Sequence, residues 1–173
     1  ALRDLNFLEV RFDVEFKKNE GFSANGNDSI QFLISTNPGE NLQPLSKVAS
    51  GGELSRIMLG FKSILAGKDE VETLIFDEID TGVSGSIAEK MALIMEEMGN
   101  QNRQVISITH LPQIAARGIT HYKVYKEDTD TGTNSHIRRL TDEERVKEIA
   151  NMLSGATLTD AALNNAKVLL GYK

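Results

Sequence analysis

Three short stretches of the sequence carry residue types that could handle a phosphate group. Ser50-Gly51-Gly52-Glu53 stands before a run with helical spacing, Asp77-Glu78 follows a short apolar segment, and His110 follows another. Hydroxyl and backbone N–H groups donate hydrogen bonds to phosphate, and carboxylates hold hard cations or orient water. These positions are the first candidates for chemistry.

The Ser50–Glu53 stretch has two interpretations. Serine and glutamate three residues apart, ahead of an apolar-periodic run, form a capping box that needs no ligand. A capping box does not explain Gly51 and Gly52, which let another backbone or a ligand come close. The unpaired N–H groups at such a helix start also suit an anion such as phosphate. Both interpretations stay open on the local pattern.

Asp77 and Glu78 follow the apolar segment 72–76, which is typical of a buried parallel strand. Ligands of open α/β sheets bind at the carboxyl ends of strands, where Asp77 could hold a hydrated Mg²⁺. Glu78 could orient an attacking water. The alternative is an acidic, solvated junction between strand and loop.

His110 ends the next apolar segment, 104–109. A single histidine at such a place is often purely structural. If the two strands lie side by side, however, His110 and Glu78 emerge at one edge, and His110 could hydrogen-bond a γ-phosphate.

The elements that must position these residues can be read from hydrophobic periodicity. A strand with alternating apolar residues from Leu8 to Phe16, a turn over 20–29 and a strand over 30–36 predict a hairpin, followed by a loop over 37–47. Thr141 and Thr159 are predicted N-caps. The other expected elements are helices from 54 to a stop at Gly67 and over 86–98, 113–117, 142–153 and 159–170, and a hairpin of strands 122–126 and 135–140.

The order of elements predicts the fold class. The middle of the chain alternates strand and helix, which predicts an α/β fold with a mainly parallel sheet, antiparallel hairpins and one domain over 1–173.

Two of the expected helices have an apolar stripe. The stripes are Leu54, Ile57, Met58, Phe61 and Leu65 in the first helix, and Ile87, Met91, Ile94, Met95 and Met98 in the second.

Composition excludes several functions. The formal net charge is −6, which disfavours a domain that mainly grips nucleic acid. The chain has no cysteine, so it has neither disulfides nor thiolate metal sites, and no apolar run is long enough to span a membrane. Because it starts at Ala1 without an initiator methionine or a leader, we expect it to be a piece of a longer protein.

Taken together, the stretches resemble the C-terminal half of an ABC-type ATPase head. Ser50–Glu53 resembles the signature motif, 75–78 resembles Walker B with its catalytic glutamate, 80–83 falls at the D-loop, and His110 falls at the switch histidine. Glu53 and Ile79 replace the glutamine and proline usual in transporters, which points to the SMC-like branch. Longer runs are similar to the RecN family of bacterial DNA repair proteins: 37–40, 42–45, 47–56, 76–85, 109–115 and 148–153.

The resemblance implies roles for these residues with ATP and Mg²⁺. Asp77 would help hold Mg²⁺ through water, and Glu78 and His110 would be catalytic. The nucleotide-binding residues would be Ser50, Gly51, Gly52, Glu53 and Asp80.

The implied partners follow from the sandwich of ATP between two heads in this family. They are the N-terminal Walker A lobe of the same protein, the second head of a homodimer and, through the parent protein, DNA, with no membrane. Gly60, Gly67 and Lys68 have the wrong spacing for a Walker A loop. We therefore expect the Walker A lobe and a coiled coil to lie outside this chain, and the isolated chain to be inactive.

Three other functions remain as alternatives: a non-catalytic module that docks heads, a transporter's ATP-binding subunit, and a direct DNA-binding domain. Two metal sites are disfavoured. The run 128–132 resembles a calcium loop, but Arg139 stands where such a loop ends in glutamate. His121 and His136 lack partners at zinc-ligand spacing.

Overall fold

The computed structural model describes residues 2–5, 7, 9–47, 51–65, 68, 71–83, 85–129, 132–155 and 157–172. The chain forms two compact units, one of residues 1–70 with 81–83 and one of 71–80 with 84–173. Each unit combines helices with strands, which confirms the α/β class. The expectation of a single domain over 1–173 stays a prediction.

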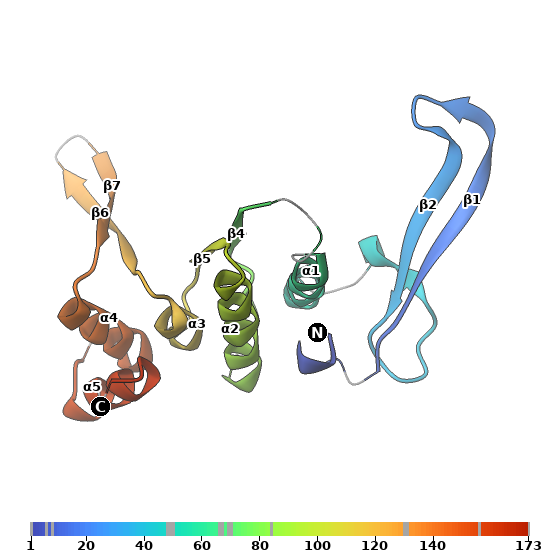
Figure 1. The fold of residues 1–173 in the computed structure, drawn as a ribbon. Coiled ribbons are helices and arrows are strands. Elements are labelled where there is room, and N and C mark those ends of the chain that lie inside the picture. Colours follow the sequence, from blue (N-terminus) through green and yellow to red (C-terminus); the bar gives the residue numbers. More distant parts are fainter. Residues whose placement is uncertain are drawn as a thin grey trace. The chain divides into compact units, whose positions relative to one another are not determined.

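The first unit contains a long antiparallel hairpin (Figure 1), in which β1 (Arg11–Ser23) pairs with β2 (Gly26–Ser35). A short strand, β3 (Gln43–Pro44), and a 3-10 helix, η2 (Leu45–Lys47), follow within the predicted loop. The hairpin is confirmed, but the turn is much tighter than the predicted 20–29. Gly26 has a φ of 99°, and the Ser23 hydroxyl donates to the Gly26 carbonyl at 2.8 Å, so two residues suffice to reverse the chain.

One face of this hairpin is apolar, and helix α1 (Gly51–Leu65) covers its root. Phe12 stacks on Phe32 with 5.8 Å between ring centroids and meets Phe61 of α1 edge-on at 5.1 Å. Ile34 is buried there, whereas Phe16, further out on the same face, is 69% exposed. The apolar face therefore extends beyond the part that α1 covers.

Helix α1 buries Ile57 of the predicted stripe but otherwise buries different residues. Leu54, Met58 and Leu65 are exposed, whereas Ile57, Leu59 and Gly60 are buried. The short helix η1 (Arg3–Leu5) accounts for this: a Cβ on Gly60 would lie 2.6 Å from the Leu2 side chain just before it. The helix is apolar on two sides, so its periodicity could not show which side is covered.

The second unit has a parallel pair of strands, β4 (Thr73–Asp77) and β5 (Gln104–Ile108), with helix α2 (Gly85–Asn100) between them in the chain. Met91, Met95 and Met98 of the predicted α2 stripe are buried. The prediction of a strand buried on both faces is wrong for one face. Leu74 and Phe76 are buried, but Ile75 is 65% exposed because nothing among the described residues covers that side.

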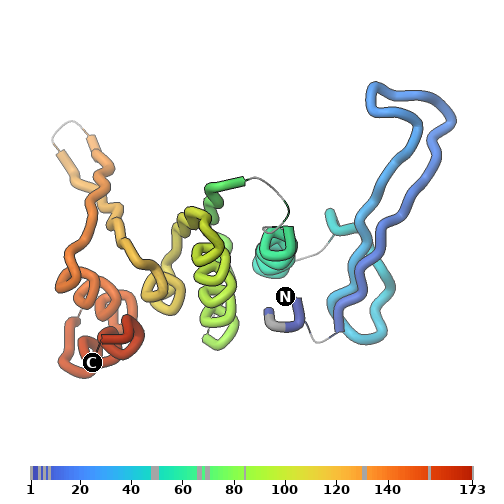
Figure 2. The backbone as a smooth tube through the Cα atoms, in the orientation of Figure 1, coloured from blue at the N-terminus to red at the C-terminus, as the bar shows by residue number. Residues whose placement is uncertain are grey.

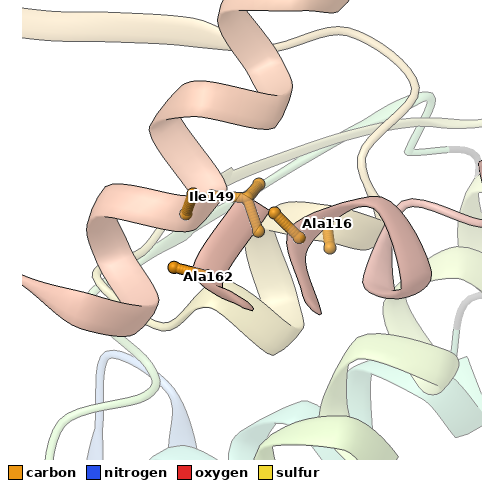
Figure 3. Packing of buried hydrophobic residues seen from close by; sticks show 5 residues of the cluster. Ala116, Ile149 and Ala162 are labelled. Atoms are coloured by element: carbon orange, nitrogen blue, oxygen red, sulfur yellow. The ribbon is translucent and has the colours of Figure 1, made fainter. Parts of the chain in front are cut away.

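The rest of this unit is helix α3 (Pro112–Arg117), the hairpin β6 (Tyr122–Thr129) with β7 (Gly132–Arg139), and helices α4 (Asp142–Ser154) and α5 (Asp160–Leu169). Figure 2 shows the path of α4 and α5 near the C-terminus. Small residues let these helices pack closely: Ala116, Ala162 and Ala166 surround the buried Ile149 (Figure 3). The predicted N-caps Thr141 and Thr159 are confirmed, and Glu144 completes a capping box with Thr141.

Candidate functional site

The first candidate stretch lies at the start of α1, where the two glycines have different surroundings. Ser50 lies outside the described residues, so the capping box with Glu53 remains a prediction. A Cβ added to Gly51 would meet nothing within 4 Å, whereas one on Gly52 would lie 2.8 Å from the Thr81 carbonyl oxygen. Gly52 is therefore required by a backbone contact within the protein, and only Gly51 faces open space.

Arg56 holds this first turn in place, a role that the sequence analysis did not identify. Its Nε donates to the Gly52 carbonyl at 3.3 Å, its Nη1 donates to the Leu5 carbonyl at 3.2 Å, and its guanidinium lies 4.7 Å from the centre of the Phe7 ring. The only sequence signal was its position four residues after Gly52, which is one helical turn.

A small polar hollow of about 180 Å³ lies beside this turn, lined by residues that include Ser35, Lys47 and Glu53. It is smaller than ordinary small-molecule pockets, which hold roughly 300–1,000 Å³. The chemistry of this stretch is therefore better sought in its exposed backbone groups.

The second and third stretches come together at one edge of the β4–β5 pair, as predicted. Asp77 pairs with Ile108 in the parallel register, and the Glu78 N–H donates to the Ile108 carbonyl at 3.2 Å. His110 follows two residues later, so both carboxylates and the imidazole leave the sheet at its carboxyl edge. This is where ligands bind in open α/β sheets.

Glu78 has an unusual backbone. Its φ of 49° is in the left-handed region, which costs a residue other than glycine some free energy. The neighbouring strand fixes this conformation through the Ile108 hydrogen bond, and the Glu78 side chain is exposed. Such strain is often found where a side chain must point in one functional direction.

Asp80 is the buried centre of this edge, with 0% of its surface exposed. The Thr109 hydroxyl and, at 3.3 Å, the His110 backbone N–H both donate to its Oδ2. Its Oδ1 lies 3.4 Å from His110 Nδ1 but has no hydrogen-bond partner among the described residues. The Thr109 hydroxyl also accepts from the Leu111 N–H at 3.0 Å. Asp80 thus ties the end of β4 to the turn after β5.

Asp77 is the carboxylate of this edge that could help to hold Mg²⁺. Among the described residues there is no group of three or more histidines, aspartates or glutamates that could hold a metal. Mg²⁺ in nucleotide enzymes usually takes one or two carboxylates and completes its shell with phosphates and water. The exposed Asp77 carboxylate suits that arrangement.

The described residues of the rejected calcium loop pair across the β6–β7 hairpin. The Thr133 hydroxyl donates to the Asp128 carboxylate at 2.7 Å, so this carboxylate is used within the β6–β7 hairpin. Within the described ranges, no helix has the length and apolar character needed to cross a membrane.

The fold of the chain is similar to that of solved SMC head domains. The Smc head domain of Pyrococcus yayanosii superimposes with a TM-score of 0.63 and 17% identity, covering 88% of this chain and 28% of that one. A chain solved in work on the ATP-driven dimerisation of SMC ATPases superimposes with a TM-score of 0.55 and 17% identity. The match covers 90% of this chain and 89% of that one. No protein-family model matches the chain.

Curated relatives identify the family. The DNA repair protein RecN of Halalkalibacterium halodurans is 44% identical over 98% of this chain, and that of Treponema pallidum is 46% identical over the same share. The chain belongs to the RecN family. It spans only 30% of the length of each of these two relatives.

Proposed function

We propose that this chain is the C-terminal part of an ATP-hydrolysing head in an SMC-like protein that acts in DNA double-strand break repair and recombination. The observation that carries the proposal is the convergence of Asp77, Glu78 and His110 at the carboxyl edge of the β4–β5 pair. The family supports the repair role, since the curated relatives are named DNA repair proteins.

The three residues have separate roles in this proposal. Asp77 helps to hold Mg²⁺ through water, and the bound ion neutralises charge on the phosphates. Glu78 accepts a hydrogen bond from the attacking water, and its backbone hydrogen bond to Ile108 fixes its direction. His110 contacts the γ-phosphate. Phosphoryl transfer depends chiefly on such positioning and charge stabilisation.

The start of α1 serves a different nucleotide in this proposal. Ser50, Gly51, Gly52 and Glu53 contact the γ-phosphate held by the second head of a homodimer. Gly51 is exposed and a Cβ there would meet nothing within 4 Å, so this residue leaves room for a phosphate at the N-terminal end of α1, which favours an anion. ATP then stabilises the engaged pair of heads, and hydrolysis releases it.

The main phosphate cradle is proposed to lie in an N-terminal Walker A lobe of the same protein. DNA is bound through other parts of the parent protein, which acts in the cytoplasm at the nucleoid. We therefore expect the isolated chain of residues 1–173 to bind ATP weakly and to hydrolyse it negligibly. Release of phosphate by the purified chain at ordinary ATPase rates, about 1 s⁻¹ or more, would contradict this expectation.

The decisive experiment is Glu78→Gln in the full-length protein. The amide keeps the size of the side chain but is a much weaker base, so we expect kcat for ATP to fall by about 10²- to 10⁴-fold. Binding of ATP and ATP-driven head engagement, measured by nucleotide titration and crosslinking, should remain. Unchanged hydrolysis in this variant would remove Glu78 from the reaction and, with it, the proposed site.

A further inference from the structure

Asp80 carries a buried oxygen that the fold leaves without a hydrogen bond. Its Oδ2 accepts from the Thr109 hydroxyl and the His110 backbone N–H, whereas its Oδ1 has no hydrogen-bond partner among the described residues. An unsatisfied buried acceptor is destabilising and calls for an explanation in a native structure.

The His110 side chain carries a nitrogen close to this oxygen. Its Nδ1 lies 3.4 Å from Asp80 Oδ1, beyond ordinary hydrogen-bond length, and 64% of the His110 side chain is exposed. The ring therefore has room to turn, and a small rotation would bring Nδ1 into hydrogen-bond range. The His110 backbone cannot move as easily, because its N–H is already bonded to Oδ2.

The chemistry of the two groups decides what this rotation achieves. An ionised carboxylate only accepts hydrogen bonds, so the His110 Nδ1 that faces it must carry a hydrogen. The two ring nitrogens are on opposite sides of the imidazole. Fixing Nδ1 on the buried carboxylate therefore aims Nε2 outward, where it can donate to a phosphate oxygen only when the ring carries a hydrogen on both nitrogens.

We infer that Asp80 is a positioning residue for His110. It holds the Thr109–His110 turn through Oδ2 and fixes the His110 ring through Oδ1 when nucleotide is bound. This inference rests on the proposed function, in which His110 contacts the γ-phosphate. It also gives Asp80 a role through His110, in place of the direct nucleotide contact implied by the family resemblance.

The test is a double-mutant cycle on the full-length protein, with Asp80→Asn, His110→Ala and their combination. Asparagine can still accept from Thr109 and from the His110 N–H, but its amide presents a donor to Nδ1 where an acceptor is needed. We expect Asp80→Asn to lower kcat by about 10- to 100-fold, as loss of an orienting partner typically does, with little change in KM for ATP.

The combined variant separates positioning from a general structural role. If Asp80 acts through His110, removing the His110 ring makes Asp80→Asn almost silent, so the double variant should hydrolyse ATP as slowly as His110→Ala alone. Multiplication of the two single effects, or an unchanged kcat in Asp80→Asn, would overturn the inference.

A second pair of variants covers the case in which Asp80→Asn does not fold. Thr109→Val removes the hydroxyl that donates to Asp80 but keeps the shape of the side chain, and Thr109→Ser keeps the hydroxyl. We expect Thr109→Val to lower kcat without adding to His110→Ala, and Thr109→Ser to retain activity. A Thr109→Val enzyme as active as wild type would count against the inference.

Failure of the proposed function would look different. In that case the full-length protein would lack ATP hydrolysis, or hydrolysis would be indifferent to Glu78→Gln and to His110→Ala. An enzyme that depends on Glu78 and His110, but in which Asp80 and His110 act independently, would refute only the positioning role.

Discussion

The start of α1 and the paired ends of β4 and β5 are built in opposite ways. At the start of α1 the chain omits side chains: Gly51 faces open space and Gly52 lets the Thr81 carbonyl come close. At the strand ends a buried side chain holds the turn, since Asp80 accepts from the Thr109 hydroxyl and from the His110 backbone N–H. The first region offers backbone groups, and the second offers oriented side chains.

This difference determines how each region can fail. A site made from backbone is damaged by adding atoms, because any new side chain competes with the carbonyl or the ligand for the same space. A site made from interlocked side chains is damaged by removing atoms, because the remaining polar partners are left unsatisfied. Variants at the two glycines test the first half of this comparison.

Of the two glycine variants, Gly52→Ala is expected to lower the free energy of unfolding more. The new Cβ would lie 2.8 Å from the Thr81 carbonyl oxygen, so the backbone itself must move. Forcing an extra methyl group into a packed position typically costs about 1–3 kcal/mol. Denaturant unfolding of the full-length protein should show a loss of free energy of unfolding in this range, together with reduced ATP hydrolysis.

Gly51→Ala is the matched control and has a smaller expected effect on stability. Alanine at this position meets nothing within 4 Å, and alanine favours a helix over glycine by up to about 1 kcal/mol. The free energy of unfolding should stay equal or rise, whereas ATP-driven head engagement should weaken. Equal destabilisation by both alanine variants would show that the two glycines do not differ as described.

The smallest expected effect is on the pH dependence of stability, through His121 near the end of helix α3. At the end of α3, the Gly118 carbonyl accepts from Arg145 at 2.9 Å and lies 3.1 Å from His121 Nε2. Burial lowers the pKa of His121, and the nearby Arg145 charge lowers it further. The folded state thus favours neutral His121, so its contribution to stability is present above about pH 6.5 and is lost as pH falls below that value.

Thermal unfolding between about pH 8 and pH 5 can check this sign. Wild-type protein should lose more of its apparent melting temperature below about pH 6.5 than His121→Gln, which cannot titrate there. Parallel curves for the two proteins would contradict the expected role of His121 at the end of α3.

The sequence predicted the strand-end region well because its signals are local. An apolar run that ends in Asp77-Glu78 and another that ends before His110 imply parallel strands, and the carboxyl ends of such strands share an edge. The N-caps Thr141 and Thr159 were equally local, since each needs only the backbone N–H three residues further on.

Features that depend on distant partners could not be read in this way. The contact of Gly52 with Thr81, and that of Arg56 with Leu5, join residues far apart in the sequence. The buried side of α1 was predicted only in part for the same reason: Ile57 is buried as expected, but Gly60 is covered by the distant Leu2. The inward direction of Asp80 likewise appears only once the turn after β5 is in place.

Residues Thr81–Val83 pack with the first unit although the residues on both sides of them belong to the second. The polypeptide therefore passes from one unit to the other three times, after residues 70, 80 and 83. A cut at any one of these boundaries leaves at least one unit without some of its residues. Neither unit can therefore be expressed or exchanged as one continuous stretch, and chimeras should keep residues 1–173 together.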